Sequence, residues 1–144
     1  MIMRSYLKTT LLLAAGGTLF AGYLSGVKLF TGTCAFGESC PYFLGYPSCW
    51  YGFGMFLAMT IVSALGLAGR IPAPRAAKTN ALIALAGTLF AGYFVVDEVV
   101  RWLAAPAATR YGLVLPTCVY GLVFYVIILV LSVRAARLPQ TKVA

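Results

Sequence analysis

The chain contains no histidine, and only three of its 144 residues are acidic. The absence of imidazole excludes acid–base catalysis by histidine, haem ligation by histidine and most zinc sites, so we expect no metal site. Charged residues make up 10% of the chain, whereas soluble domains average roughly 25%. Hydrophobic residues make up 62%, and this composition excludes an ordinary soluble domain.

Four segments lack any charged side chain: residues 9–27, 39–69, 79–96 and 111–133. Each is long enough for the roughly 20 residues that an α-helix needs to cross a bilayer, the third only just. Transmembrane strands would alternate polar and apolar residues, and these segments do not. The sequence therefore predicts an all-α integral membrane protein, residues 1–144, with four transmembrane helices in a single domain.

The net charge of +8 is divided unevenly between the ends of these segments. One set of ends carries eight basic residues: Arg4, Lys8, Arg70, Arg75, Lys78, Arg134, Arg137 and Lys142. The opposite ends carry the other three, Lys28, Arg101 and Arg110, and every acid, Glu38, Asp97 and Glu98. The positive-inside rule then places both termini in the cytoplasm and both hairpin loops outside. The basic residues indicate topology and attraction to anionic membrane lipid, and we expect no nucleic-acid partner.

The chain repeats itself. Residues 17–23, Gly-Thr-Leu-Phe-Ala-Gly-Tyr, recur letter for letter as residues 87–93. A second block follows, in which a Cys-x-Tyr-Gly sequence from residue 49 recurs from residue 118. We therefore predict a tandem duplication of a two-helix hairpin, with repeat one over residues 8–69 and repeat two over residues 78–137. Because each copy crosses the membrane twice, the copies should be related by a pseudo-two-fold axis along the membrane normal. The first span is then a permanent helix rather than a cleaved signal peptide.

Small residues on the first and third helices predict close helix packing. Gly22 and Gly26 form a Gly-x-x-x-Gly pair, and such pairs let two backbones approach closely in lipid. We expect Gly87, Ala91 and Gly92 to do the same on the third helix. The charged residues Asp97, Glu98 and Arg101 lie at the outer end of that helix, where we expect all three to be solvated.

The helix boundaries follow from prolines and charges. Pro47 and Pro116 precede the second and fourth helices, because proline is tolerated in a first turn. Cys49 and Cys118 then fall in the first turns of these helices. The third helix is expected to run from residue 79 to about residue 100, after a linker over residues 69–77 with two prolines.

All four cysteines are expected on or near the outer face, where disulfides persist in a periplasm or an endomembrane lumen. Cys34 and Cys40 are close enough in sequence to form a disulfide, either as a staple or as an exchanging pair. In first turns, the thiolates of Cys49 and Cys118 would be stabilised by the helix dipole and by unpaired amides. Alternatively, both are small apolar side chains at a helix contact.

An outer loop with a spaced cysteine pair, Cys34 and Cys40, followed by Gly45-Tyr46-Pro47 and Gly52, resembles the vitamin K epoxide reductase family. The resemblance extends to Cys118 at the outer end of the fourth helix. It implies that loop cysteines oxidise a thioredoxin-like partner and that a helix-end pair passes electrons to a quinone. The family has Cys-x-x-Cys there, whereas Gly121 stands at the second cysteine's position here. Cys49 would have to supply the missing thiol.

The predicted function is that of a membrane thiol–disulfide oxidoreductase. It would pass electrons from a thioredoxin-like protein through Cys34, Cys40, Cys49 and Cys118 to a quinone. The quinone would dock among aromatic residues at the outer ends of the second and fourth helices: Trp50, Tyr51 and Tyr120. The protein would be multi-pass in the cell membrane, with the cysteine-bearing loop on the extracytoplasmic side.

Two other functions remain open. The first is a non-catalytic four-helix scaffold, or an accessory subunit of a larger membrane complex, braced by disulfides on its outer face. The second is a small transporter. The sequence favours it least, because no charged residue falls near the membrane midplane, where such residues mark ion or proton paths.

Overall fold

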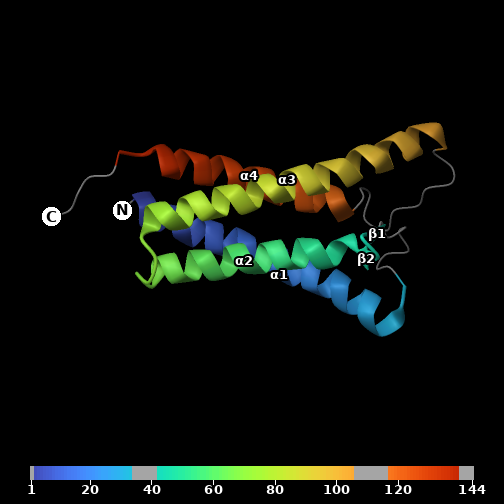
Figure 1. Cartoon of the computed structure of the whole chain (residues 1–144), viewed down its shortest axis with the longest axis horizontal. Helices are drawn as coiled ribbons and strands as arrows, with labels where there is room; N and C mark the ends of the chain where they lie inside the picture. Colours follow the sequence, from blue (N-terminus) through green and yellow to red (C-terminus); the bar gives the residue numbers. More distant parts are fainter. Residues whose placement is uncertain (1, 34–41, 106–116, 140–144) are drawn as a thin grey trace.

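The computed structural model describes residues 2–33, 42–105 and 117–139. The elements follow the order α1 (Ile2–Thr31), β1 (Tyr42–Phe43), β2 (Tyr46–Pro47), α2 (Ser48–Leu67), α3 (Ala73–Ala104) and α4 (Thr117–Arg137), as Figure 1 shows. Each helix contains an 18-residue window with a mean hydropathy between 1.5 and 2.2, and each is long enough to cross a membrane. The prediction of an all-α chain with four long apolar helices is confirmed.

The four helices pack as an antiparallel bundle. α1 packs chiefly against α2, and α3 chiefly against α4, while α2–α3 and α1–α4 contacts close the ring. α2 and α4 begin at the same end of the bundle, beside the two short strands, and we call this the hairpin end (Figure 1). α1 begins and α4 finishes at the opposite end, which we call the basic end. It carries Arg4, Lys8, Arg70, Arg75, Lys78, Arg134 and Arg137.

A tight turn leads the chain into α2. Strands β1 and β2 pair antiparallel, with Tyr42 opposite Pro47. Leu44 and Gly45 form the turn, with φ angles of 50° and 84°. Two central residues with positive φ suit the right-handed twist of a two-stranded hairpin. Pro47 then caps α2 at its N-terminus, as the sequence predicted.

α3 begins earlier than predicted. The linker expected over residues 69–77 is wrong for its second half, because α3 starts at Ala73. Proline at the start of a helix costs no hydrogen bond, so Pro74 is compatible with the first turn. Ala76 and Ala77 are fully buried and pack with Leu7 of α1. These contacts extend the helix into a stretch whose charges and prolines had indicated a loop.

The same positions are buried in both copies of the repeated sequence. Buried residues of α1, at Thr10, Ala14, Gly17 and Ala21, recur 70 positions later in α3 as Asn80, Ala84, Gly87 and Ala91. Buried residues of α2, at Phe56, Met59 and Ser63, recur 69 positions later in α4 as Tyr125, Ile128 and Ser132. The helix faces that form the core are therefore equivalent in the two hairpins.

A pair of aromatic rings lies at the centre of the bundle. The rings of Phe56 and Tyr125 stack with their centroids 4.3 Å apart and their planes 10° apart. Phe56 lies over Gly17 of α1, and Tyr125 lies over Gly87 of α3. A methyl group at either glycine would overlap the ring above it, so a larger residue at these two positions would force the ring to shift.

Only some of the glycines that were predicted to pack closely do so. Gly22 lies against the ring of Phe53, and Gly87 lies against Tyr125, as predicted. For Gly26 and Gly92 the prediction is wrong, because no side chain of the described residues comes within 4 Å of the position of an added methyl group. Gly17, which was not predicted from the Gly-x-x-x-Gly pattern, is one of the two glycines with the closest side-chain contacts.

Candidate functional site

Cys49 and Cys118 are each the second residue of their helix, α2 and α4, as predicted. Both helices begin at the hairpin end, so both thiols lie at that end of the bundle (Figure 1). Both side chains are half-buried, and within the part of the chain that the structure describes no disulfide joins them. Cys34 and Cys40 lie outside the described residues, so their disulfide stays a prediction.

The second half of α1 contacts the first turns of both cysteine-bearing helices. The hydroxyl of Ser25 donates a hydrogen bond to the carbonyl oxygen of Cys49 at 3.3 Å. One turn earlier on α1, the ring of Phe20 packs edge-on against Tyr120, two residues after Cys118, with the centroids 6.3 Å apart. α1 is therefore the common support of the two turns.

Four rings from three elements form an aromatic cluster beside Cys49: Phe43, Tyr51, Phe90 and Phe94. The rings of Phe43, Tyr51 and Phe90 contact one another, with centroids 5.4 to 5.5 Å apart. Phe94 joins through Phe90 at 5.0 Å. The hydroxyl of Tyr51 donates to the carbonyl oxygen of Phe43 at 3.0 Å, which ties the β-hairpin to α2. The cluster thus connects β1, α2 and α3.

The three aromatic residues predicted to hold a quinone have separate ring partners. Tyr51 belongs to the aromatic cluster, and Tyr120 packs against Phe20. Trp50 packs against Tyr46 with the centroids 5.8 Å apart, and these two side chains are 37% and 57% exposed. All three lie at the hairpin end, and the Trp50–Tyr46 pair is the part that stays accessible.

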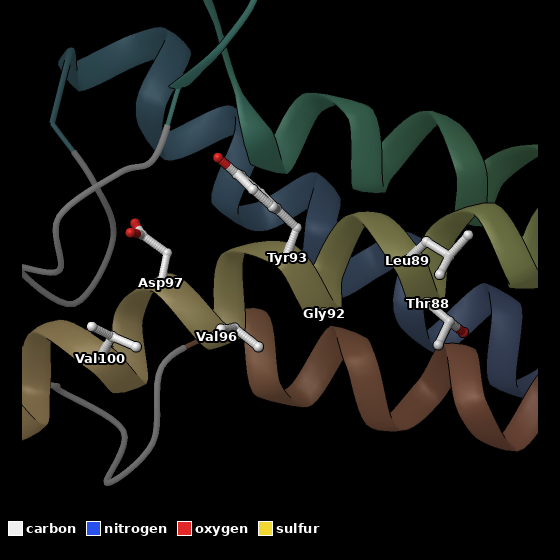
Figure 2. Close-up of a pocket in the computed structure, with 7 residues that line it drawn as sticks. All are labelled: Thr88, Leu89, Gly92, Tyr93, Val96, Asp97 and Val100. Atoms are coloured by element: carbon white, nitrogen blue, oxygen red, sulfur yellow. The ribbon is translucent and has the colours of Figure 1, made fainter.

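A groove of about 580 Å³ follows the second half of α3, and we call it the α3 groove. Figure 2 shows the residues that line it: Thr88, Leu89, Gly92, Tyr93, Val96, Asp97 and Val100. Its lining is apolar except for Thr88, the hydroxyl of Tyr93 and the carboxylate of Asp97. The ring of Tyr93 contacts that of Phe94 at 5.2 Å. The aromatic cluster therefore continues into the wall of the groove.

The two hairpins differ at one ring next to Gly92, a residue of the α3 groove. In the first hairpin, Phe53 of α2 covers Gly22 of α1. The equivalent glycine of α3 is Gly92, and the residue equivalent to Phe53 is Leu122 of α4. The shorter leucine side chain does not reach within 4 Å of a methyl group built on Gly92, and the space above the glycine stays open.

The charged residues near the end of α3 fall in two environments. Asp97 and Arg101 form an ion pair of 2.8 Å on the exposed face, as expected for solvated charges. The prediction is wrong for Glu98, which is only 7% exposed and is the one charged side chain buried among the described residues. Glu98 follows the helical spacing of the buried residues Ala91 and Phe94, so it points into the bundle. That spacing was the signal that could have identified it.

A layer of buried polar side chains crosses the bundle near the basic end: Tyr6, Thr10, Ser63, Asn80 and Ser132. All four helices contribute to this polar layer. The hydroxyls of Tyr6 and Ser132 are hydrogen-bonded at 2.7 Å. The amide nitrogen of Asn80 donates to the hydroxyl of Ser63 at 3.0 Å and to that of Tyr6 at 3.4 Å. Thr10 Oγ1 and Asn80 Oδ1 make no hydrogen bond to any described residue.

The polar layer was not among the predicted sites, although the repeated sequence contains a signal for it. Thr10 corresponds to Asn80, and Ser63 corresponds to Ser132, at the offsets of the two matching blocks. Polar residues at equivalent positions inside charge-free runs indicate a shared buried site, because an isolated polar group in lipid is costly.

Comparison of the chain with models of protein families, with curated proteins and with solved structures finds no match. The resemblance to the vitamin K epoxide reductase family therefore stays a prediction that rests on the cysteines and glycines quoted for it. Among the residues that the structure describes, no group of three or more histidine, cysteine, aspartate or glutamate side chains could hold a metal ion.

Proposed function

We propose that this protein is a membrane thiol–disulfide oxidoreductase whose reactive groups lie at the hairpin end. It takes two electrons from the dithiol of a thioredoxin-like partner and passes them to a quinone. The observation that carries the proposal is the position of Cys49. It lies in the first turn of α2, two residues before Tyr51, whose aromatic cluster continues into the apolar α3 groove.

The orientation in this proposal follows from charge. Seven basic residues of the described chain lie at the basic end, and the two described acids lie toward the C-terminal end of α3. The positive-inside rule then places the basic end in the cytoplasm and the hairpin end on the extracytoplasmic side, where thiol oxidation proceeds. The equal burial of equivalent positions supports two hairpins related by a pseudo-two-fold axis.

The reaction consists of two thiol–disulfide exchanges and one reduction of the acceptor. A thiolate of the partner attacks the Cys34–Cys40 disulfide, and the partner leaves as a disulfide. The reduced loop pair then reduces a Cys49–Cys118 disulfide in the same way. The two resulting thiols give two electrons and two protons to the quinone, which leaves as a quinol.

The quinone would use two neighbouring surfaces. The exposed Trp50–Tyr46 pair offers flat faces to a planar ring, next to Cys49. The α3 groove offers Leu89, Val96 and Val100 to an isoprenoid tail. Tyr51 follows Trp50 in the chain, and its ring contacts Phe90, from which ring contacts run through Phe94 to Tyr93 in the groove.

Reconstitution tests the proposal. The protein in vesicles with a ubiquinone is expected to oxidise dithiothreitol, with one quinol formed per dithiol. Cys49→Ser and Cys118→Ser should each abolish this activity, because a serine hydroxyl cannot replace a thiolate as nucleophile or leaving group. Absence of any quinone-dependent oxidation by the wild-type protein would overturn the proposal.

A pair of groove variants tests the place of the quinone. Val96→Trp fills the α3 groove and is expected to raise the KM for quinone several-fold while the KM for the dithiol stays unchanged. Val123→Trp, an exposed position on α4, serves as the matched control for added bulk. Equal effects of the two substitutions would remove the groove from the proposal.

A second function, a scaffold or accessory subunit, is favoured by a different observation. Three exposed residues of α1 recur unchanged and equally exposed on α3: Leu12 and Leu82, Leu19 and Leu89, and Tyr23 and Tyr93. Packing inside the bundle does not require the same residue types at these exposed positions. A membrane partner that binds the exposed faces of both α1 and α3 would require them. A scaffold would keep its partner in Cys49→Ser and Cys118→Ser variants and would lose it on Leu19→Ala and Leu89→Ala substitution.

A further inference from the structure

A second groove, of about 390 Å³, lies between α1 and α4 at the basic end, and we call it the α1–α4 groove. The residues of its lining that matter here are Ser5, Tyr6, Thr9, Leu131, Arg134 and Leu138. We infer that this groove binds the headgroup of an anionic phospholipid. A lipid site at the basic end is independent of any thiol chemistry at the hairpin end.

Charge is the first argument. Arg134 is exposed in the groove, and six further basic residues of the described chain lie at the same end. The two acids that the structure describes, Asp97 and Glu98, lie about 28 Å along α3 from Lys78, at roughly 1.5 Å per residue. This distance exceeds the Debye length of about 8 Å at physiological salt, so these acids do not neutralise the basic end. An anionic headgroup supplies the missing charge.

The chemistry of the lining is the second argument. A guanidinium binds phosphate oxygens through two parallel N–H groups, and Arg134 provides it. Ser5 and Thr9 are exposed on the facing helix, one turn apart, and their hydroxyls can donate to the remaining phosphate oxygens. Leu131 lies about one turn deeper in the membrane than Arg134, where an acyl chain leaves the headgroup. The lining therefore combines a guanidinium and two hydroxyls with apolar side chains such as Leu131 and Leu138.

The floor of the groove is held in place by the polar layer. Tyr6 is only 8% exposed, and its hydroxyl is hydrogen-bonded to Ser132 at 2.7 Å and accepts from Asn80 at 3.4 Å. These two bonds fix the ring between α1 and α4 before any ligand binds. A preformed floor lowers the conformational cost of binding.

The equivalent seam between α2 and α3 is closed, although it carries a basic residue, Arg75, in place of Ser5. There, Ala76 stands in place of Tyr6, Gly66 in place of Ala135, and Leu65 in place of Arg134. A methyl group on Gly66 would lie 3.1 Å from the side chain of Ala76, so α2 and α3 approach closely. Of the two equivalent seams, the one between α1 and α4 is the open one.

Native mass spectrometry of the full-length protein in detergent tests the inference. Phosphatidylglycerol and phosphatidylcholine with the same acyl chains are titrated separately, and the bound fraction is measured. The wild-type protein is expected to bind one phosphatidylglycerol at least about five-fold more tightly than phosphatidylcholine. Arg134→Gln should remove this preference. Arg75→Gln, which loses the same charge at the same end on α3, should keep it.

Ser5→Trp provides a second variant, because it fills the groove and leaves Arg134 in place. It is expected to lose phosphatidylglycerol binding with an unchanged melting temperature, since Ser5 is exposed. Equal binding of the two lipids by the wild-type protein would overturn the inference. Equal losses of the phosphatidylglycerol preference in Arg134→Gln and Arg75→Gln would also overturn it. That result would mean that the summed charge of the basic end, and not the groove, attracts the lipid. Displacement of the lipid by millimolar inorganic phosphate would show that the groove is a site for free phosphate and would overturn the assignment to a lipid headgroup.

Discussion

Gly17 and Gly87 each lie beneath an aromatic ring of the following helix, and the two rings stack on each other. The order of layers is therefore glycine, ring, ring, glycine, across four helices. Flat rings fit between closely spaced backbones only where no side chain intervenes. At the scale of single residues, these two glycines set how near α1 comes to α2 and α3 comes to α4.

Gly87→Ala is expected to lower the free energy of unfolding by about 1–3 kcal/mol, because the new methyl group overlaps the ring of Tyr125. Gly92→Ala is the matched control on the same helix. It meets no described side chain and should be neutral or stabilising by up to about 1 kcal/mol, because alanine is the better helix former. Equilibrium unfolding in mixed micelles, followed by far-UV circular dichroism, measures both. Equal stabilities of the two variants would contradict the ring-over-glycine contact.

At the scale of elements, the polar layer connects helices that apolar packing alone would leave weakly specified. Lipid tails are as apolar as leucine, so burial of apolar surface does not select one helix pairing over another. Hydrogen bonds between Tyr6 and Ser132 join α1 to α4, and those of Asn80 join α3 to α2 and to α1. The layer thus favours one arrangement of the two hairpins.

Asn80→Ala removes two hydrogen bonds and is expected to lower the free energy of unfolding by about 1–2 kcal/mol, since interhelical hydrogen bonds in membranes average about 0.6 kcal/mol and reach about 1.7. Asn80→Thr, the residue found at the equivalent position of α1, should cost less. The exposed neighbour substitution Thr79→Ala is the control and should be neutral. Unfolding in mixed micelles again provides the measurement. An unchanged free energy of unfolding in Asn80→Ala would show that the polar layer does not stabilise the helix packing.

The elements differ in how well the sequence predicted them. The four spans and the first-turn positions of Cys49 and Cys118 follow from charge-free runs and prolines, which are local signals. The early start of α3 and the burial of Glu98 depend on which neighbouring helix covers each face. Charge and proline content carry no information about that neighbour, so both predictions failed.

For the candidate site, the sequence predicted residue types better than contacts. Trp50, Tyr51 and Tyr120 lie at the expected end, but each packs against a partner from a different element. The space above Gly92 in the α3 groove stays open where Leu122 takes the place of the ring of Phe53. Such a difference acquires meaning only when the two hairpins are superimposed in space.

At the scale of the whole molecule, the proposed orientation predicts which segments are accessible from outside the cell. In a variant without native cysteines, Leu44→Cys in the β-hairpin should react with a membrane-impermeant maleimide in intact cells. Ala68→Cys, exposed after α2 at the basic end, should react only after permeabilisation. Both substitutions leave every basic residue in place. The opposite labelling pattern would reverse the orientation and remove the thiols from an oxidising compartment.

The joining of both hairpins in one polypeptide has a consequence for what each half can become. Two separate copies of a single hairpin would have to present identical residues to each other at every symmetric position. Here a threonine, Thr10, corresponds to an asparagine, Asn80, and Phe56 stacks on a tyrosine, Tyr125, whose hydroxyl donates to the carbonyl of Gly52 at 3.1 Å. Covalent linkage fixes a one-to-one stoichiometry at any expression level. It also lets one half form a hydrogen bond that the equivalent residues of the other half do not form.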